Sequence, residues 1–145
     1  MIEALSAMGS VFTDPYLLSL IFATTILGVI IGVLPGLGAT TGAALLLPFT
    51  LTMEPVQAIA VLSTIYVSAT FAGSITAILI NTPGTSAAAA TTFDGYPLAQ
   101  KGEAGRALGI AVVSSTVGGV FSVIVLCIAA PLLARVAYEL DRKTH

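Results

Sequence analysis

Three long stretches of this chain carry no charged side chain and are rich in Ala, Leu, Ile and Gly. They lie between Pro15 and Met53, between Pro55 and Phe93, and between Ala107 and Ala134. Each exceeds the roughly 20 apolar residues that a helix needs to cross a bilayer. Membrane β-strands would instead alternate apolar and polar positions. The pattern therefore predicts membrane-spanning helices over about residues 16–34, 55–80 and 107–130.

A proline-glycine pair interrupts each of the first two stretches, at Pro35-Gly36 and at Pro83-Gly84. Each pair is followed by a short run of small and hydroxyl residues, over about 39–49 and 85–93. Such runs correspond to roughly 16 Å of helix, which is too short to cross a bilayer. We therefore expect two half-helix or re-entrant segments. Pro131 is expected to end or kink the third span.

Polar segments connect and flank these spans. Residues 94–106 contain several charges and predict a polar loop, and the tail after Arg135 is polar. The first 14 residues place apolar side chains at helical spacing, which fits a short interfacial helix or, equally, a disordered terminus. They contain no Lys or Arg, so we expect the first span to be retained rather than cleaved as a secretory signal.

Composition narrows the class of protein. The chain is 57% hydrophobic and only 8% charged, whereas soluble domains carry about 25% charged residues. This predicts an all-α, polytopic integral membrane protein, a helical bundle with broken or re-entrant helices whose surroundings are the lipid bilayer. No basic patch suits nucleic acid. Cys127 and His145 are single residues of their kinds, so we expect no metal cluster, no cofactor and no enzyme activity.

The two breaks carry the candidate chemistry. A half-helix that begins inside the membrane presents free N–H groups and a partial positive charge, which attract anions such as carboxylates. The preceding helix end offers carbonyl oxygens to Na⁺ or to a proton carrier. The candidate substrate-binding residues are Gly36, Gly38, Thr40, Thr41, Asn81, Pro83, Gly84, Thr85 and Ser86. The candidate ion-binding groups are the carbonyls of Leu34 and Ile80 and the amide of Asn81, with Pro35 and Pro83 as the structural breaks.

A simpler interpretation exists for each feature. Proline and glycine are common in membrane helices and often only kink them. Gly28, Gly32 and Gly36 form a stripe that favours close helix packing more than chemistry. The hydroxyl residues between 63 and 76 can bond to their own backbone or to a neighbouring helix.

Four runs of sequence together resemble a known family. They are GVIIGVLPGLG at 28–38, LLLP at 45–48, AGSITAILINTPG at 72–84 and DGYPLAQKGEAGRALG at 94–109. These motifs resemble the first part of the large membrane subunit of tripartite tricarboxylate transporters, from about Leu27 to Gly119. Residues 67–72 depart from the pattern, since family members often carry further Gly and Tyr there.

The resemblance implies a multi-pass carboxylate permease of the bacterial inner membrane, driven by a Na⁺ or H⁺ gradient. Its implied partners are a citrate-like carboxylate substrate, a small membrane subunit and a periplasmic solute-binding protein. Because the family's subunit has several hundred residues in two similar halves, we expect this chain to be a fragment. The alternative function is a small non-transporting membrane module that assembles through its Gly and Ser stripes.

Overall fold

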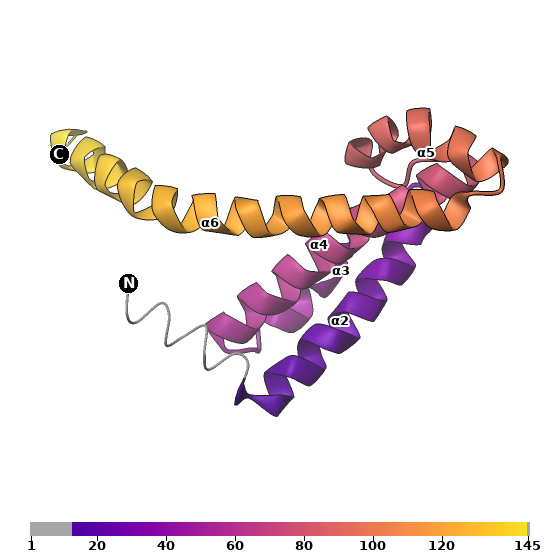
Figure 1. Ribbon diagram of the computed structural model, residues 1–145. Helices are drawn as coiled ribbons and strands as arrows, with labels where there is room; N and C mark the ends of the chain where they lie inside the picture. The colour runs from indigo at the N-terminus through magenta and orange to yellow at the C-terminus, as the bar shows by residue number, and fades with distance from the viewer. Residues whose placement is uncertain (1–12, 145) are drawn as a thin grey trace. The chain divides into compact units, whose positions relative to one another are not determined.

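The computed structural model describes residues 13–144, and every regular element in that range is a helix. The first 12 residues, which include most of the segment considered for an interfacial helix, lie outside it. Three helices are long and apolar enough to cross a membrane, over Pro15–Val33, Pro55–Ile80 and Ala104–Pro131. The predicted fold class, an all-α membrane protein, is confirmed. Figure 1 labels the elements: α2 Pro15–Val33, α3 Ala39–Thr50, α4 Pro55–Ile80, η1 Ser86–Ala90, α5 Thr91–Gln100 and α6 Ala104–Thr144.

The first helix, α2, has a complete N-terminal cap. The Asp14 carboxylate accepts hydrogen bonds from the backbone N–H groups of Tyr16 at 2.9 Å and Leu17 at 3.3 Å. Pro15 occupies the first helical position, where a missing N–H costs nothing. The cap therefore satisfies donors that would otherwise be unpaired next to an apolar span.

The helices α2 and α4 pack in parallel through small residues. A Cβ on Gly28 would overlap the Ser68 side chain, and a Cβ on Gly32 would overlap the Ala69 carbonyl. Gly28 faces Ile65 and Ser68, and Gly32 faces Ala69 and Ala72, so the contacts advance by four residues along each helix and the two helices run in the same direction (Figure 1). Gly28 and Gly32 of the predicted glycine stripe thus form a packing surface, whereas Gly36 lies in the turn after the helix and has no atom within 4 Å of a Cβ position.

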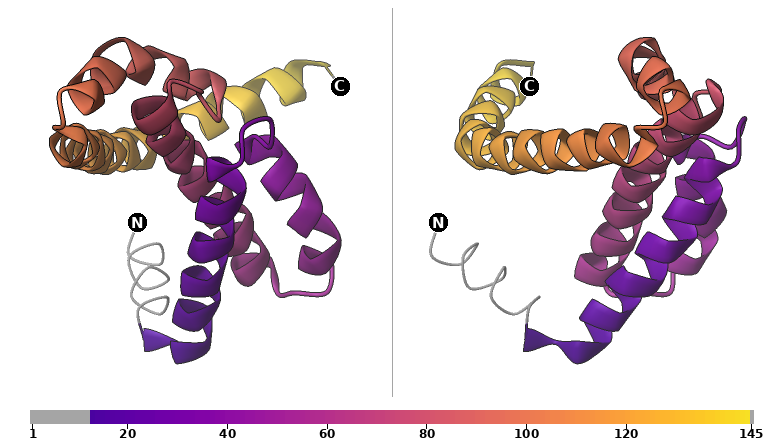
Figure 2. Two further views of the ribbon diagram at one scale, coloured as in Figure 1. Left: turned by 90° about the vertical axis from the view of Figure 1, so that its right-hand side faces the viewer. Right: turned by 45° about the vertical axis from the view of Figure 1, so that its right-hand side comes forward.

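The short helix α3 turns back alongside this pair. Its 12 residues correspond to about 18 Å, and it packs on both α4 and α2. A Cβ on Gly42 would lie 3.4 Å from the Ile31 side chain of α2 and 3.5–3.6 Å from the Ile65 side chain of α4. Figure 2 shows α3 returning toward the end at which α2 and α4 begin. The segment therefore folds back on α2 and α4 rather than continuing α2.

The predicted polar loop over 94–106 is wrong except at residues 101–103, because α5 runs to Gln100 and α6 begins at Ala104. The chain after the second break forms the 3-10 turn η1 and continues directly into α5, Thr91–Gln100. This α5 packs on α4, where a Cβ on Gly95 would lie 2.7 Å from the Ile78 side chain. Gly102, at φ 83°, then ends the turn that follows α5. The close approach that Gly95 permits outweighs the helix-breaking tendency of Gly95 and Pro97.

The last helix, α6, forms most of a separate unit, Gly109–His145. The structure extends it through Pro131 to Thr144, so of the two outcomes predicted at Pro131, an end or a kink, the helix does not end there, and the polar tail after Arg135 is helical as far as Thr144. Proline lacks the N–H for the usual helical bond and crowds the carbonyl four residues earlier, which bends rather than ends a helix. Figure 2 shows the helix axis changing direction toward its yellow end.

Candidate functional site

The first break is a tight turn that reverses the chain between α2 and α3. The carbonyl of Leu34 accepts a hydrogen bond from the N–H of Leu37 at 3.1 Å, with Pro35 and Gly36 at the two central positions. Gly36 has φ 92°, the left-handed region that a type II turn requires at this place and that glycine adopts without strain. Proline-glycine at this position therefore has a direct conformational cause.

The start of α3 leaves backbone donors without partners. Gly38 is the N-cap and contributes no side-chain acceptor, and the first bond within the helix joins Gly42 N–H to the Gly38 carbonyl at 3.1 Å. Among the described residues, the N–H groups of Ala39, Thr40 and Thr41 have no acceptor. The side chains of Thr40 and Thr41 are exposed. This helix end combines free donors with the positive end of the helix dipole.

The second break begins with a left-handed residue at the end of α4. Asn81 has φ 56° and ψ 26°, and asparagine is among the few side chains that tolerate this region. The carbonyl of Thr76 accepts the N–H of Asn81 and also the N–H of Thr82 at 3.3 Å. The amide side chain of Asn81 itself is exposed.

After Asn81 the chain runs back along α4 and inserts a glycine between two helices. The N–H of Gly84 donates to the Gly73 carbonyl at 3.3 Å. A Cβ on Gly84 would lie 2.5 Å from the Gly32 carbonyl of α2 and 2.9 Å from the Cα of Gly73. Gly73 lies seven residues before the end of α4, or about 10 Å. The second break therefore reaches the C-terminal end of α2 within the length of α4.

Thr85 and Ser86 start the turn η1 at this level. The Thr85 hydroxyl accepts the N–H of Ala88 at 3.3 Å, so Thr85 is the cap of the turn. Thr85 also packs against Gly73, where a Cβ would lie 2.9–3.1 Å from Thr85 atoms. Ser86 is exposed and Thr85 is half-buried.

The structure brings some of the predicted residues together and separates others. Gly84 lies against the end of α2 that leads into Pro35, and Thr85 lies against Gly73 of α4. Within the described residues, however, α3 and η1 make no contact, so the two half-helix starts are not joined. The carbonyls considered for ion binding each accept one bond: Leu34 from Leu37 N–H at 3.1 Å and Ile80 from the Thr82 hydroxyl at 3.3 Å. Each keeps one further lone pair.

Sequence reasoning assigned no site role to three residues that hold this arrangement: Gly32, Gly73 and Thr76. Gly32 was predicted as packing stripe and Thr76 as a hydroxyl that bonds within its own helix. The Thr76 hydroxyl does bond within α4, to the Gly73 carbonyl at 3.1 Å. Ser68 and Thr70 bond in the same way, to the Thr64 and Tyr66 carbonyls at 2.6 and 2.7 Å. The spacing Gly73-x-x-Thr76 before the break was the available signal.

Two shallow grooves lie elsewhere on α4. One, of about 400 Å³, runs between α2 and α4 and is lined by Thr25, Ser63, Thr64, Val67, Ser68 and Phe71. The other, of about 390 Å³, lies between α3 and α4 beside Ala43 and Tyr66. Neither contains a predicted site residue. No group of three or more metal-ligating side chains gathers in the described part of the chain.

Comparison with known proteins gives one curated relative and one family. An uncharacterized 52.8 kDa protein in the TAR-I ttuC' 3' region of Agrobacterium vitis is 49% identical over 118 residues, covering 81% of this chain and 24% of that protein. The chain thus spans about a quarter of the length of this relative. No solved structure matches. The family model of the tripartite tricarboxylate transporter TctA family matches residues 18–144. The chain belongs to the TctA family.

Proposed function

We propose that these residues form part of a carboxylate permease of the bacterial inner membrane. A Na⁺ or H⁺ gradient drives its import of di- and tricarboxylates. The protein works with a small membrane subunit and a periplasmic solute-binding protein. Membership of a transporter family and three helices able to span a membrane support this proposal. The observation that carries it is the contact of Gly84 with the Gly32 carbonyl, which brings the second break to the end of α2 that precedes the first break.

The start of α3 is the proposed carboxylate contact. Its unpaired N–H groups at Thr40 and Thr41, with the two exposed hydroxyls, offer several donors to one anionic group. Backbone donors bind a carboxylate without placing Arg or Lys inside the membrane, which costs at least about 2.5–3.5 kcal/mol for each charge. Gly36 and Gly38 allow the substrate to approach the backbone, because neither carries a side chain.

The second break supplies the remaining polar groups. Ser86 and Thr85 offer hydroxyls at the level of Gly73, and the Asn81 amide is exposed at the end of α4. The free lone pairs of the Leu34 and Ile80 carbonyls, together with the Asn81 oxygen, are the proposed ligands of the coupling cation. Pro83 starts the extended return of the chain and Gly84 allows it to dock on α2.

The experiment measures uptake of radiolabelled citrate. Because the chain covers 24% of its relative, these residues are tested within a full-length family permease, expressed with both partner subunits. We expect saturable uptake that other di- and tricarboxylates inhibit and that collapses when the driving Na⁺ or H⁺ gradient is removed. Uptake no greater than in cells lacking the permease, for every carboxylate tested, would rule the proposal out.

Two variants test the site assignment. Pro35→Ala and Asn81→Ala are expected to impair uptake while the amount of protein in the membrane stays the same. Thr70→Val is the matched control, since Thr70 lies on α4 but its hydroxyl only bonds back to Tyr66. If both site variants transport as well as the control, the breaks do not form the substrate site.

A further inference from the structure

One buried residue of α4, Thr76, holds both ends of the segment that leaves the helix. Its carbonyl accepts the N–H groups of Asn81 and Thr82, the first residues of the break. Its hydroxyl donates to the Gly73 carbonyl at 3.1 Å. That same carbonyl accepts the Gly84 N–H at 3.3 Å, at the far end of the segment. The hydroxyl also lies 3.5 Å from where a Cβ on Gly84 would be.

Gly73 provides the surface of α4 on which this segment packs. A Cβ at residue 73 would lie 2.9 Å from the Thr85 nitrogen and 3.0 Å from its hydroxyl oxygen. Because one of these atoms belongs to the backbone, any side chain at this position would push Thr85 away from α4. Gly73 and Thr76 thus determine how far the segment stands from α4 and how closely Gly84 approaches α2.

We propose that Gly73 and Thr76 are positioning residues of the carboxylate site: they hold Thr85 and Ser86 at the depth at which these side chains meet the substrate. This inference rests on the proposed carboxylate permease function. Neither residue presents a group to the substrate, because the Thr76 hydroxyl is bonded within α4 and Gly73 has no side chain. Gly73 and Thr76 therefore act only by placing the second break.

The first test separates substrate affinity from protein yield. Thr76→Val keeps the shape of the side chain and removes the hydroxyl, and Gly73→Ala adds the displacing methyl group. Each is expected to raise the KM for citrate uptake about tenfold, below the about hundredfold that a misplacement of 1 Å can cause. The maximal rate for each molecule in the membrane should change far less. Thr76→Ser keeps the hydroxyl and should restore the KM of the unmodified permease.

Matched controls distinguish the placement of the second break from a general effect of altered helix packing on the KM. Thr70→Val makes the same change on the same helix at a hydroxyl that does not touch the break. Gly95→Ala strains the contact of α5 with α4, where a Cβ would lie 2.7 Å from Ile78. Both should leave the KM unchanged. If Thr76 had only a general structural role, its variants would lower the amount of folded protein, and Thr76→Val and Thr76→Ser would have the same KM.

A second measurement does not depend on transport. Ser86→Cys in a Cys127→Ala background is labelled in membranes with a small anionic methanethiosulfonate reagent. Thr76→Val and Gly73→Ala should change the labelling rate about threefold or more, as expected when a segment loses a local restraint, whereas Thr76→Ser and Thr70→Val should not. In the parent protein citrate should slow the labelling.

The outcomes distinguish this inference from the proposed function. If no carboxylate is taken up and none slows the labelling of Ser86→Cys, the proposed function is overturned. The labelling rates of the variants then test the positioning role without the transport data. Equal KM values and equal labelling rates for valine and serine at position 76, with Gly73→Ala also unchanged, overturn the positioning role even if uptake is strong.

Discussion

Gly84, which follows the second proline, lies directly against the backbone carbonyl of Gly32 in α2, so that a Cβ at residue 84 would come within 2.5 Å of that oxygen. Gly32 lies three residues before Pro35, so this contact joins the second break to the helix end that forms the first. The two breaks are separated by the whole of α3 and α4 along the chain. Their meeting is a property of the fold and explains why residue 84 is glycine.

Replacing Gly84 with alanine should therefore disrupt the docking of the second break on α2. The new methyl group would meet backbone atoms on both sides, and backbone moves less readily than a side chain. Overpacking of this kind costs about 1–3 kcal/mol of unfolding free energy. The measurement is equilibrium unfolding in detergent micelles, followed by helical circular dichroism.

Gly118→Ala is the control for that change. Gly118 lies on α6, and a Cβ there would meet no atom within 4 Å. We expect its unfolding free energy to equal that of the parent or to exceed it by up to about 1 kcal/mol, because alanine favours a helix over glycine. Equal stability of Gly84→Ala and Gly118→Ala would contradict the close contact with Gly32.

Asn81 combines a conformational role with a proposed chemical one, and two substitutions separate them. Its left-handed backbone suits glycine, so Asn81→Gly should fold as well as the parent. Asn81→Val should cost about 1–2 kcal/mol, because a branched side chain crowds the backbone in this region. Unfolding of both variants in micelles measures this difference.

The same glycine variant tests the amide. If the Asn81 oxygen binds the coupling cation, Asn81→Gly should lose gradient-driven citrate uptake although it folds normally. Normal uptake by Asn81→Gly would show that the Asn81 amide does not bind the cation and that the residue only ends α4.

Much of this architecture follows from local physical chemistry that the sequence displays. Long charge-free runs predict spanning helices, because a helix satisfies its backbone hydrogen bonds within its own segment and the runs lack the alternation of membrane strands. The Gly28 and Gly32 spacing predicts close helix packing, and the structure uses both in the contact of α2 with α4. Pro35-Gly36 predicts a break at the end of the first span, and a hydrogen-bonded turn occurs there.

The remaining features depend on contacts between distant residues. The chain over 91–100 contains Gly95 and Pro97, so its local preference is against a helix, and packing on Ile78 of α4 supplies the missing stability. The partner of Gly84 is a carbonyl 52 positions earlier in the chain. One sequence without related sequences contains no signal that pairs these positions, so the roles of Gly73 and Thr76 emerge only from the fold.

The N-terminal cap of α2 gives a third prediction. Asp14→Ala removes the acceptor for the Tyr16 and Leu17 N–H groups and should cost about 1 kcal/mol. Hydrogen exchange at these two amides in micelles should accelerate about fivefold, which corresponds to that free energy. Asp14→Ser retains an acceptor and should exchange close to the parent rate. Unchanged exchange in the alanine variant would show that the cap does not hold the first turn.

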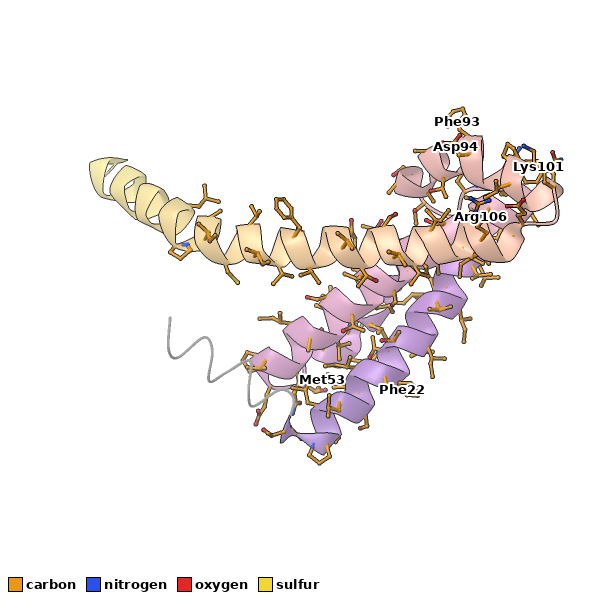
Figure 3. The ribbon with its side chains drawn as sticks, viewed as in Figure 1. Phe22, Met53, Phe93, Asp94, Lys101 and Arg106 are labelled. Carbon is orange, nitrogen blue, oxygen red and sulfur yellow. The ribbon has the colours of Figure 1, made fainter. Side chains whose placement is uncertain are left out.

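The hairpin formed by α2 and α3 gives a prediction for membrane topology. Figure 3 shows Met53, which follows α3, at the end where α4 begins, and Lys101 at the opposite end of α4. Single cysteines at Tyr16 and Met53 should therefore be labelled by an impermeant maleimide from one side of the membrane, and a cysteine at Lys101 from the other. The background is Cys127→Ala, and each variant is tested in sealed right-side-out and inside-out vesicles.

A continuous, merely kinked helix from α2 into α3 would give a different pattern. It would carry Met53 to the side opposite Tyr16 and reverse the direction of α4. The 12 residues of α3 span about 18 Å, less than the hydrocarbon core of about 30 Å, so α3 alone is too short to form a further full span. Labelling of Tyr16→Cys and Met53→Cys from opposite sides would exclude the hairpin. It would also remove the parallel packing of α2 on α4, on which the contact between Gly32 and Gly84 depends.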